Sequence, residues 1–404
     1  MPGRIAKFVT GTVLAAMLSS TSLAATPGVK IGVLTDLGGI YSDLGGPGSV
    51  VAAQMAVHDF GGSVLGHPIE VISADHQENP DTGSAIARRW IDNENVDVIV
   101  DVPVSSVAIA VQSVTKDRSK IFLNTGGSSG ELSGKACSPY AFQWTKDTYG
   151  LAVGTARALV KEGGDTWFFL TADYTFGHAL EHDAAAAVQA AGGKVLGEVE
   201  HPFNTNDFSS YLLQAQASGA RVIGMANGGG DAVRSIQQAR EFGITTGNRL
   251  LAGLSLEITD VHGIGLPVAQ GTYVTDSFYW DMNDSTRAWS KRFMALHGGA
   301  APTSIQAAVY GSVTHYLQAV QAAGTKDTAT VAAKMRATPI NDFYTKGAYI
   351  RQDGRVVRDF YLFQVKTPAQ SHADWDFFNV VATIPAETAV RPLADSECPL
   401  VAKH

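Results

Sequence analysis

Cysteine is scarce in this sequence, and several common functional signatures are missing. The 404-residue chain has two cysteines, Cys137 and Cys398, and no C-x-x-C pair, which argues against a dithiol redox site or a cysteine-rich metal centre. The formal net charge is −8 and no basic stripe is visible, so nucleic acid is not an expected partner. The 42 glycines indicate many tight turns, but the glycine-rich loops match neither the Walker nor the dinucleotide-binding fingerprint.

Long apolar runs are absent after the first two dozen residues. Arg4 and Lys7 precede the apolar stretch "FVTGTVLAAML", which leads into the small residues of "SSTSLAAT". This order is typical of an export signal, and we expect residues 1–24 to be a signal peptide cleaved after Ala24. The apolar stretch is too short to span a bilayer. The mature protein is therefore predicted to be soluble and periplasmic.

The two cysteines have a natural role in such a compartment. In an oxidising environment, a lone pair of cysteines most economically forms one disulfide. We expect Cys137 and Cys398 to join the loop "GKACSPY" to the C-terminal tail "DSECPL". Two free thiols are the alternative.

Short β-like runs alternate with amphipathic helical stretches along the chain. The expected strands of the first half are residues 29–35, 69–75, 96–102 and 120–124, separated by helices at 50–60, 81–94 and 105–115. The same alternation of strands and helices then repeats, with strands expected at residues 166–173, 194–200, 221–227 and 249–254. Each crossover is long enough to hold a helix, which implies parallel sheets covered on both faces.

Two such runs, ending near Thr145 and Gly271, are too long for one sheet and predict two α/β lobes. A helix at residues 304–324 and a hairpin at 348–366 remain, so the chain is expected to cross back between the lobes. In open parallel sheets, ligands bind at the carboxyl ends of the strands. The loops expected there are rich in Gly, Ser and aromatic residues and poor in catalytic groups.

One of these loops, "NTGGSSG", fits the nucleophile turn of the α/β-hydrolases. That turn needs a helix directly after the nucleophile, but Gly130, Gly134 and Pro139 follow Ser128 closely and disfavour one. The same residues suit a cradle of backbone N–H groups and hydroxyls around an anion. We favour the cradle, with a serine hydrolase using Ser128 as the alternative from another functional class.

The segment "HALEH" fits a zinc-peptidase pattern, with His178 and His182 on one helical face and Glu181 as a base. The segment otherwise reads as the solvated start of a helix, and no further carboxylate ligand can be identified. We therefore interpret the two histidines as a surface pair, and predict neither a metal site nor a catalytic residue.

Taken in order, four stretches carry a family resemblance: "VKIGVLTDLGGIYSDLGGPG", "DTGSAIARRWIDNENVDVIVDVPVSSVAIAV", "IFLNTGGSSGELSG" and "ADYTFGHALE". The chain resembles the type I periplasmic solute-binding proteins of ABC importers over residues 29–366, in particular the branch that binds branched-chain amino acids, amides and aromatic acids. The resemblance implies an α/β fold in which two doubly wound parallel-sheet lobes are joined by three crossing segments. The implied division is 25–146 plus 279–360 for the N-terminal lobe, 147–278 plus 361–390 for the C-terminal lobe, and 391–404 for a tail.

The resemblance also implies a ligand site in the cleft between the lobes. Ser105 matches the position whose hydroxyl takes the ligand's carboxylate, and it begins a helix, whose N-terminus favours an anion. Simple N-capping or turn chemistry is the alternative role for Ser105 and Ser128. The other implied contacts come from the same strand-end loops and are Tyr41, Gly126, Gly127, Ser128, Tyr174, Phe176, Asn227, Leu254, Phe278 and Tyr279.

One departure from the family bears on the ligand. Amino-acid binders of this family pair the ligand's ammonium with an acid of the second lobe, and the matching position here falls near Leu254 in "LAGLSLEIT". Glu257 would serve only if the alignment slips by three residues. Because a buried, unpaired ammonium is costly, we expect a small aromatic carboxylate, with a branched-chain or other aliphatic amino acid or an amide as the alternative.

The expected function is capture by a monomer that closes on its ligand and delivers it to a membrane permease, without catalysis or a cofactor. Presentation of the ligand to a sensory receptor stays open as another outcome of the same capture.

Overall fold

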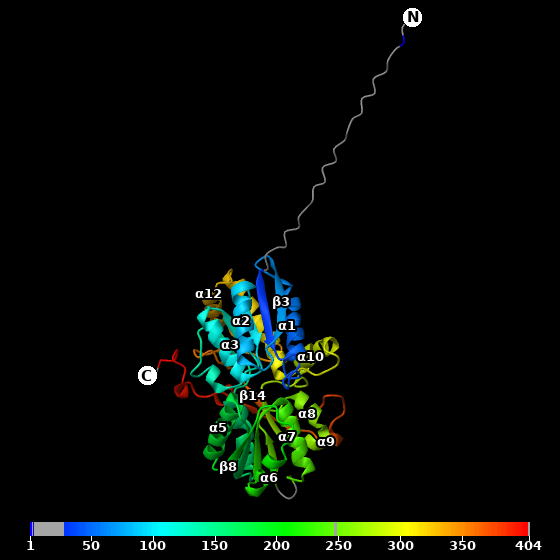
Figure 1. Ribbon diagram of the computed structural model, residues 1–404, viewed down its shortest axis with the longest axis vertical. Helices are drawn as coiled ribbons and strands as arrows, with labels where there is room; N and C mark the ends of the chain where they lie inside the picture. Colours follow the sequence, from blue (N-terminus) through cyan, green and yellow to red (C-terminus); the bar gives the residue numbers. More distant parts are fainter. Residues whose placement is uncertain (2, 4–27, 246–248, 403–404) are drawn as a thin grey trace.

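The computed structural model describes residues 1, 3, 28–245 and 249–402. The ranges 28–245 and 249–402 form two lobes stacked along the long axis of the molecule (Figure 1). The predicted signal peptide lies outside the described residues, apart from residues 1 and 3. Within the described ranges, no helix combines the length and the apolar character that a bilayer crossing requires.

The first lobe is built on a six-stranded sheet in the order β2-β3-β1-β4-β5-β6, in which every neighbouring pair is parallel except β2 and β3. Its strands are β1 (Val29–Thr35), β2 (Ser63–Val64), β3 (His67–Asp75), β4 (Val98–Asp101), β5 (Ile121–Asn124) and β6 (Ala141–Gln143). Its helices include α1 (Gly46–Phe60), α2 (Pro80–Asn93) and α3 (Ser105–Asp117). The predicted alternation of strands and helices is confirmed.

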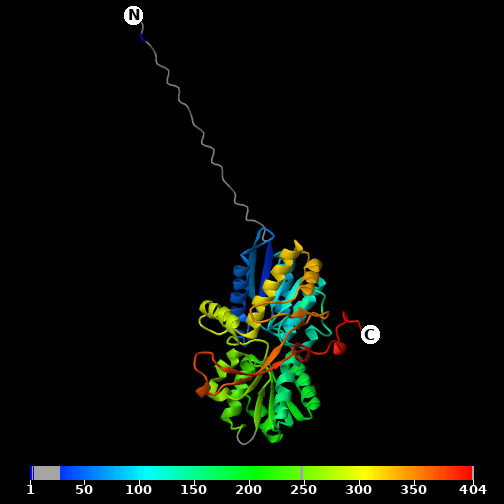
Figure 2. The ribbon, with the colours of Figure 1, turned by 180° about the vertical axis from the view of Figure 1, so that it is seen from behind.

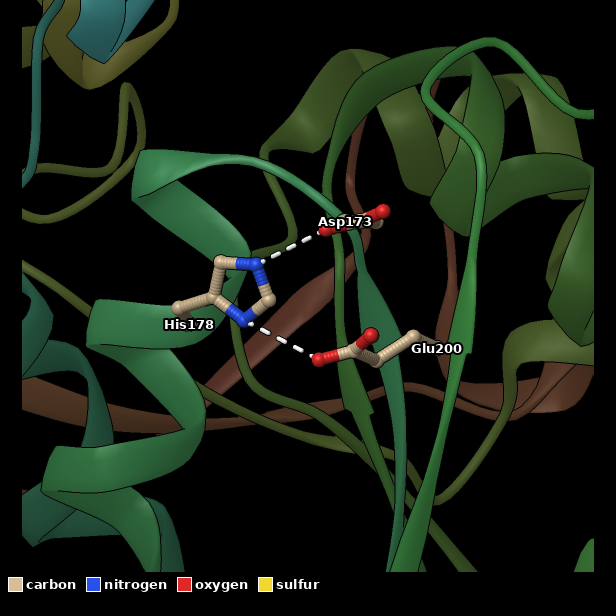
Figure 3. Close-up of side chains that lie close together, drawn as sticks. All are labelled: Asp173, His178 and Glu200. Atoms are coloured by element: carbon tan, nitrogen blue, oxygen red, sulfur yellow. Dashed lines mark hydrogen bonds and ion pairs between the residues drawn. The ribbon is translucent and has the colours of Figure 1, made fainter.

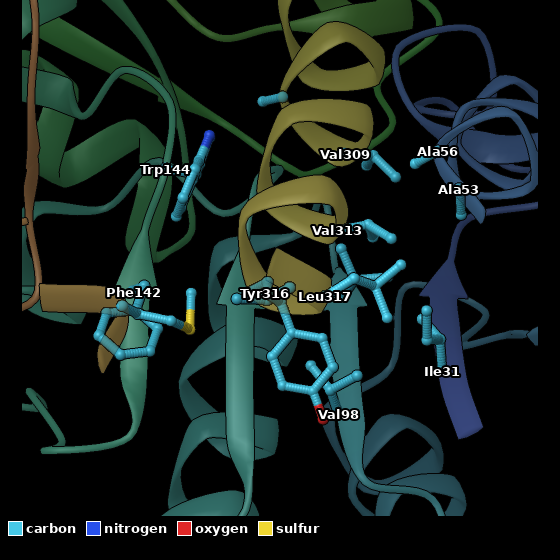
Figure 4. Close-up of a cluster of buried hydrophobic side chains, with 14 of the residues drawn as sticks. Ile31, Ala53, Ala56, Val98, Phe142, Trp144, Val309, Val313, Tyr316 and Leu317 are labelled. Atoms are coloured by element: carbon cyan, nitrogen blue, oxygen red, sulfur yellow. The ribbon is translucent and has the colours of Figure 1, made fainter. Parts of the chain in front are cut away.

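Both faces of this sheet are buried. Val98 and Val100 of β4 pack into one core with α1 and α11 (Ser304–Ala323), part of which is drawn in Figure 4. Ile99, between them, faces the opposite core under α2 and α3. Successive side chains of a strand point to opposite faces, so a strand covered on both sides is apolar along most of its length, as Val98, Ile99 and Val100 are.

The second lobe repeats this plan with a parallel sheet in the order β10-β9-β7-β8. The strands are β7 (Thr166–Ala172), β8 (Lys194–His201), β9 (Val222–Ala226) and β10 (Leu250–Gly253). The helices are α4 (Thr148–Lys161), α5 (Thr175–Ala190), α6 (Ser209–Ala217), α7 (Gly229–Glu241), α8 (Ile258–Ile264) and α9 (Leu266–Ala269). Phe168 and Leu170 of β7 face one core of this lobe, and Trp167 and Phe169 face the other.

Three segments connect the lobes. The chain leaves the first sheet after β6, returns after β11 (Tyr273–Asp276) to α10 (Asp284–Leu296), α11 and α12 (Thr328–Ala337), and crosses again before β14 (Phe360–Val365). Strands β11, β14 and β15 (Phe378–Ile384) form a separate antiparallel sheet. Seen from behind, the orange and red C-terminal part runs across the molecule where the lobes meet (Figure 2).

The predicted hairpin at residues 348–366 is wrong in its second half. Only β12 (Tyr349–Ile350) and β13 (Val356–Val357) pair with each other, through a turn in which Gly354 has a φ of 82°. Strand β14 pairs with β11 and β15 instead, because its apolar residues Phe363 and Val365 complete a core of the second lobe. The alternating pattern predicted the strand but not its partner.

The C-terminal tail is held against both lobes. Cys137 and Cys398 form the predicted disulfide, with 5.6 Å between their Cα atoms, and both residues are buried. Before it, the short helix α13 (Ala386–Ala389) leads to Arg391, whose guanidinium binds the carboxylate of Asp183 on α5. The tail therefore bridges the first lobe, through the disulfide, and the second, through an ion pair.

Candidate ligand-binding site

A small cavity of about 30 Å³ lies between the lobes where the strands of both sheets end. The first lobe, with α11, contributes the loops after β1, β4 and β5, the second contributes the loops after β7, β9 and β10, and Lys146 comes from the first crossing segment. The lining residues are Tyr41, Leu44, Pro103, Gly126, Ser128, Lys146, Tyr174, Phe176, Gly228, Ser255, Glu257 and Ile305. This placement is the one that parallel sheets favour for ligands.

An aromatic bridge closes the cavity across the two lobes. The hydroxyls of Tyr41 and Tyr174 are hydrogen-bonded to each other, and the ring of Phe203 lies 6.0 Å from that of Tyr41 and 5.0 Å from that of Tyr174. Burial, followed by the proximity of Tyr174, raises the pKa of Tyr41 well above its usual value, so both groups are neutral phenols at physiological pH. Nearby, the carbonyl of Ile40 accepts a hydrogen bond of 3.2 Å from Gly230 N on α7. These contacts hold the lobes in a closed arrangement.

The serine-containing loop after β5 forms the polar wall. The Ser128 hydroxyl lines the cavity and donates to the Gly126 carbonyl at 3.3 Å. The Ser105 hydroxyl oxygen accepts from the backbone N–H groups of Ser128 and Ser129 at 3.2 and 3.1 Å, and Ser105 is 1 % exposed. Ser105 thus lies behind the loop and fixes its shape, while Ser128 of the same loop lines the cavity.

The loop does not have the architecture of a nucleophile turn. Ser129 caps the single 3-10 turn η1 (Gly130–Leu132), and no α-helix starts there, as the glycines of the loop predicted. The Ser128 hydroxyl donates to the Gly126 carbonyl, not to a histidine. A serine hydrolase needs both a base in hydrogen-bond reach and an oxyanion-stabilising helix start, so this geometry favours a cradle.

A buried cluster of charges forms the opposite wall. Lys146 Nζ lies 2.5 Å from Glu257 Oε1 and 2.7 Å from Asp276 Oδ2. Burial opposes the charge of Lys146, but the attraction of the two carboxylates outweighs it and raises the pKa of the amine. Burial and the repulsion of Glu257 raise the pKa of Asp276 to about 7. The cluster therefore contains a protonated lysine, Lys146, between two carboxyl groups.

The N-terminus of α11 completes this cluster. Thr303 caps the helix by accepting from Gln306 N at 3.2 Å, and the Gln306 side chain accepts from Thr303 N at 3.1 Å. This reciprocal pair fixes the first turn and leaves Ser304 N available. Ser304 N and Oγ donate to the Glu257 carboxylate at 3.3 and 2.8 Å, a contact between the lobes.

Several of the predicted ligand contacts lie away from the cavity wall. Phe278 and Tyr279 are buried in the cores of the first and second lobes, and Leu254 packs under α4 and α5. Asn227 donates to Ser235 Oγ at 3.3 Å and lies 3.2 Å from a ring nitrogen of His201. Gly127 N donates to the Asn124 side chain at 2.9 Å. Of the residues predicted for the site, the cavity brings together Tyr41, Gly126, Ser128, Tyr174 and Phe176.

The residues that sequence reasoning missed are of two kinds. The first kind consists of small or apolar residues near predicted positions, and nothing in the sequence marks them as ligand contacts. They are Leu44, Pro103, Gly228, Ser255 and Ile305. Lys146 could have been noticed, because it is a cation that follows the uncharged segment "AFQWT" at the end of the first lobe's last strand. The family alignment predicted Leu254 as a ligand contact and offered Glu257 only if the alignment shifts by three residues. Glu257 lies on the cavity wall, and Leu254 is not among the lining residues.

The segment "HALEH" lies on α5, outside the cavity. His178 is exposed and stands between Asp173, 3.0 Å from Nε2, and Glu200, 3.5 Å from Nδ1 (Figure 3). Glu181 accepts instead from the Thr171 hydroxyl at 2.7 Å. Among the described residues, Asp173, His178 and Glu200 are the one group spaced to hold a metal ion, and it excludes His182. These three exposed side chains pair with one another in a surface salt-bridge network, and His182 is exposed as well.

The chain matches the model of a known family, the periplasmic binding proteins, over residues 28–372. It belongs to this family. A crystal structure of a periplasmic binding protein from Burkholderia mallei is 47% identical, with a TM-score of 0.90, and the match covers 92% of this chain and 99% of that one. Both the family and the fold are those of solute-binding receptors.

Two further relatives carry ligand-related names. A branched chain amino acid ABC transporter periplasmic ligand-binding protein from Burkholderia xenovorans is 39% identical, with a TM-score of 0.83, over 93% of this chain and 100% of that one. The Leu/Ile/Val-binding protein homolog 6 of Brucella abortus is 27% identical over 52% of this chain. That match spans about half, 54%, of the curated relative's length.

Proposed function

We propose that this periplasmic binding protein captures a small aromatic carboxylate, such as a benzoate- or phenylpropanoid-type acid, and delivers it to the membrane permease of an ABC importer. The protein acts outside the cytoplasm as a monomer, after export through its N-terminal signal peptide. Closure of the lobes buries the ligand, and the closed form is what the permease recognises. Neither catalysis nor a cofactor takes part.

The observation that supports this ligand class is the composition of the cavity wall. Tyr41, Tyr174 and Phe176 offer rings from both lobes, against which an aromatic ligand can stack. The Ser128 hydroxyl is a neutral donor for a carboxylate once it turns from the Gly126 carbonyl, to which it donates at 3.3 Å. The one acid on the wall, Glu257, already has Lys146 and Ser304 as partners.

Within this proposal, Ser105 has a supporting role. Its hydroxyl already accepts two backbone N–H groups of the serine-containing loop, so it orients Ser128 towards the ligand. Asn227, Phe278 and Tyr279 support the wall from the cores of the two lobes. The contacts proposed for the ligand itself are Tyr41, Gly126, Ser128, Tyr174 and Phe176.

A branched-chain or other aliphatic amino acid is the second candidate. The named Burkholderia xenovorans and Brucella abortus relatives favour it, and so does the position of Glu257 on the cavity wall. An ammonium would need that carboxylate, and would have to share it with Lys146 and Ser304 or displace Lys146 from it. The two candidates therefore differ in a single feature of the ligand, the amine.

Calorimetric titration of refolded, ligand-stripped protein tests the proposal. Hydroxybenzoates and phenylpropanoid acids are compared with leucine, valine and small amides. We expect 1:1 binding of an aromatic acid, weakened about tenfold or more in Ser128→Ala, because a hydrogen bond to a charged group is lost. The matched control is Ser312→Ala, a buried serine of α11 that bonds only within its own helix and should leave the affinity unchanged. Tight binding of leucine or valine, with no binding of aromatic acids, would select the second candidate.

A further inference from the structure

Lys146 is a buried cation at the junction of the two lobes. It follows β6 on the first crossing segment, and Asp276 ends β11 at the second. Glu257 precedes α8 in the second lobe, and Ser304 starts α11, which packs in the first. All four residues are at most 3 % exposed. The cluster therefore joins both lobes and two of the crossing segments, beside the ligand cavity.

The Glu257 carboxylate has no oxygen without a partner in this cluster. Oε1 is 2.5 Å from Lys146 Nζ and accepts from Ser304 Oγ at 2.8 Å, and Oε2 accepts from Ser304 N at 3.3 Å. These are the contacts that a buried carboxylate needs, because an unpaired charge away from water is strongly unfavourable. The protein thus supplies, from its own chain, a positive charge at the wall of the cavity.

We propose that Lys146 determines the ligand class: its ammonium occupies Glu257 in place of a ligand's ammonium, so that the cleft selects carboxylates without an amine. The proposal rests on the proposed function, since it concerns the same cavity, and it identifies the group that excludes amino acids. An amino acid entering this cleft would place a second cation near Lys146 and would find the carboxylate occupied. A carboxylate without an amine needs no such partner.

Asp276 keeps Lys146 in place. Its Oδ2 lies 2.7 Å from Nζ, while its Oδ1 accepts from Ser277 N at 2.6 Å. Lys146 is thereby held from two sides, and a ligand's amine would have to displace a lysine that is fixed by the chain and by a second carboxylate. Since specificity is a difference between affinities, an occupied carboxylate discriminates against the amine without any direct contact with the favoured ligand.

The test uses pairs of ligands that differ only in the α-ammonium group: 3-phenylpropanoate with phenylalanine, and 4-methylpentanoate with leucine. The readout is the ratio of the two Kd values within a pair, measured by calorimetry. For the wild type we expect the deaminated acid to bind about tenfold or more tighter. In Lys146→Met the ratio should shift at least about tenfold towards the amino acid, because Glu257 becomes available.

Two further variants make the result interpretable. Lys146→Met with Asp276→Asn keeps the net charge of the cluster and leaves Glu257 as its one ionisable acid, so it remains informative if the single variant does not fold. Adding Glu257→Gln to Lys146→Met should cancel the shift. The matched control is Lys366→Met, which breaks another lysine–aspartate pair, that with Asp376 on the second lobe.

The outcomes distinguish a failure of the proposed role of Lys146 from a failure of the proposed ligand class. If the wild type prefers the deaminated acids but the double variant keeps the same ratio, the role of Lys146 is overturned and the proposed function stands. If the wild type binds the amino acids tighter, or binds neither these four compounds nor any hydroxybenzoate, both the ligand class and the role of Lys146 are overturned. A shift in the Lys146 variants that Glu257→Gln cancels, absent in Lys366→Met, supports the proposal.

Discussion

Two of the spaces between the lobes differ in size and in chemistry. The ligand cavity measures about 30 Å³, whereas a second space, here named the tail groove, measures about 710 Å³. The tail groove lies between the first lobe, helix α5 and the C-terminal tail. It is lined by Gly130, Glu131, Ser133, Gly134, Lys135, Asp147, Thr148, Thr175, His178, Ala179, His182, Asp183, Arg351, Asp353, Arg391, Asp395, Ser396 and Glu397.

The charges of the tail groove are largely paired within the protein. Asp183 binds Arg391 and the Thr148 hydroxyl, Arg351 lies 2.6 Å from Asp353, and Lys135 lies 3.8 Å from Glu397. The small cavity instead gathers three aromatic rings and a serine hydroxyl at the strand ends. Volume therefore does not identify the ligand site in a two-lobed receptor, because closure shrinks the space that binds and leaves other spaces open.

A substitution of Gly229 should have the largest effect on ligand binding. Gly229 begins α7 with a φ of 55°, and a Cβ there would lie 2.6 Å from the Ile40 carbonyl and 2.8 Å from the Tyr41 ring in the other lobe. Gly229→Val should prevent the lobes from meeting. We expect ligand affinity to fall roughly 10- to 100-fold, the cost of an overpacked contact.

Calorimetry measures this loss, and X-ray scattering should show a larger radius of gyration with ligand present. The matched control is Gly219→Val, which has a φ of 71° and no atom within 4 Å of its Cβ position. It carries the same backbone strain without the contact between the lobes. Equal losses of affinity in the two variants would contradict the role of Gly229 in closure.

Asp260 gives a smaller effect, on stability rather than on affinity. It accepts from Glu257 N at 2.8 Å behind the cavity, and burial raises its pKa to about 7. In the unfolded chain its pKa should be about 3.9, so between these values the folded state holds a proton that the unfolded state has released. The contribution of Asp260 to stability is therefore largest at low pH and is lost as the pH rises from about 4 to about 7.

Urea unfolding of the wild type and of Asp260→Asn across this range measures the effect. The free energy of unfolding of the wild type, relative to the variant, should fall by about 1 kcal/mol for each pH unit at the steepest point. Glu241→Gln, an exposed position of the same lobe, controls for the loss of one negative charge. A difference between wild type and Asp260→Asn that stays constant with pH would contradict the raised pKa.

Most of the fold could be predicted because each element carries its own pattern. Every residue of β4 and β5 is buried, as the continuous apolar runs indicated, and α11 runs over Ser304–Ala323, between its capping Thr303 and Gly324. The partner of β14 could not be predicted, since that strand's pattern fits a hairpin with β12 equally well. Pairing between distant strands is decided by tertiary packing, which a local pattern does not contain.

The site could be predicted as a set of loops but not residue by residue. Tyr41, Ser128 and Tyr174 reach the wall because they lie in loops directly after β1, β5 and β7. Phe278 and Tyr279 follow β11 in the same way, but their rings fill the cores of the two lobes. Lys146 and Glu257 are separated by 111 residues and meet only because the lobes close on each other. No local signal specifies such a pair.

A substitution in the tail groove should have the smallest effect on ligand binding. Arg391→Gln removes the cation beside Asp183, an acid that is 5 % exposed, and should destabilise the protein because a buried charge loses its partner. Thr148 Oγ1 still donates to Asp183 at 2.7 Å, so helix α5 keeps its position and Tyr174 still reaches Tyr41. We expect the Kd for the ligand to change less than about threefold, a difference below 1 kcal/mol, in a calorimetric titration. A loss of affinity comparable to that of Gly229→Val would mean that the tail, fixed to the first lobe by its disulfide, helps to hold the closed form, and the tail groove and the ligand cavity would then be coupled.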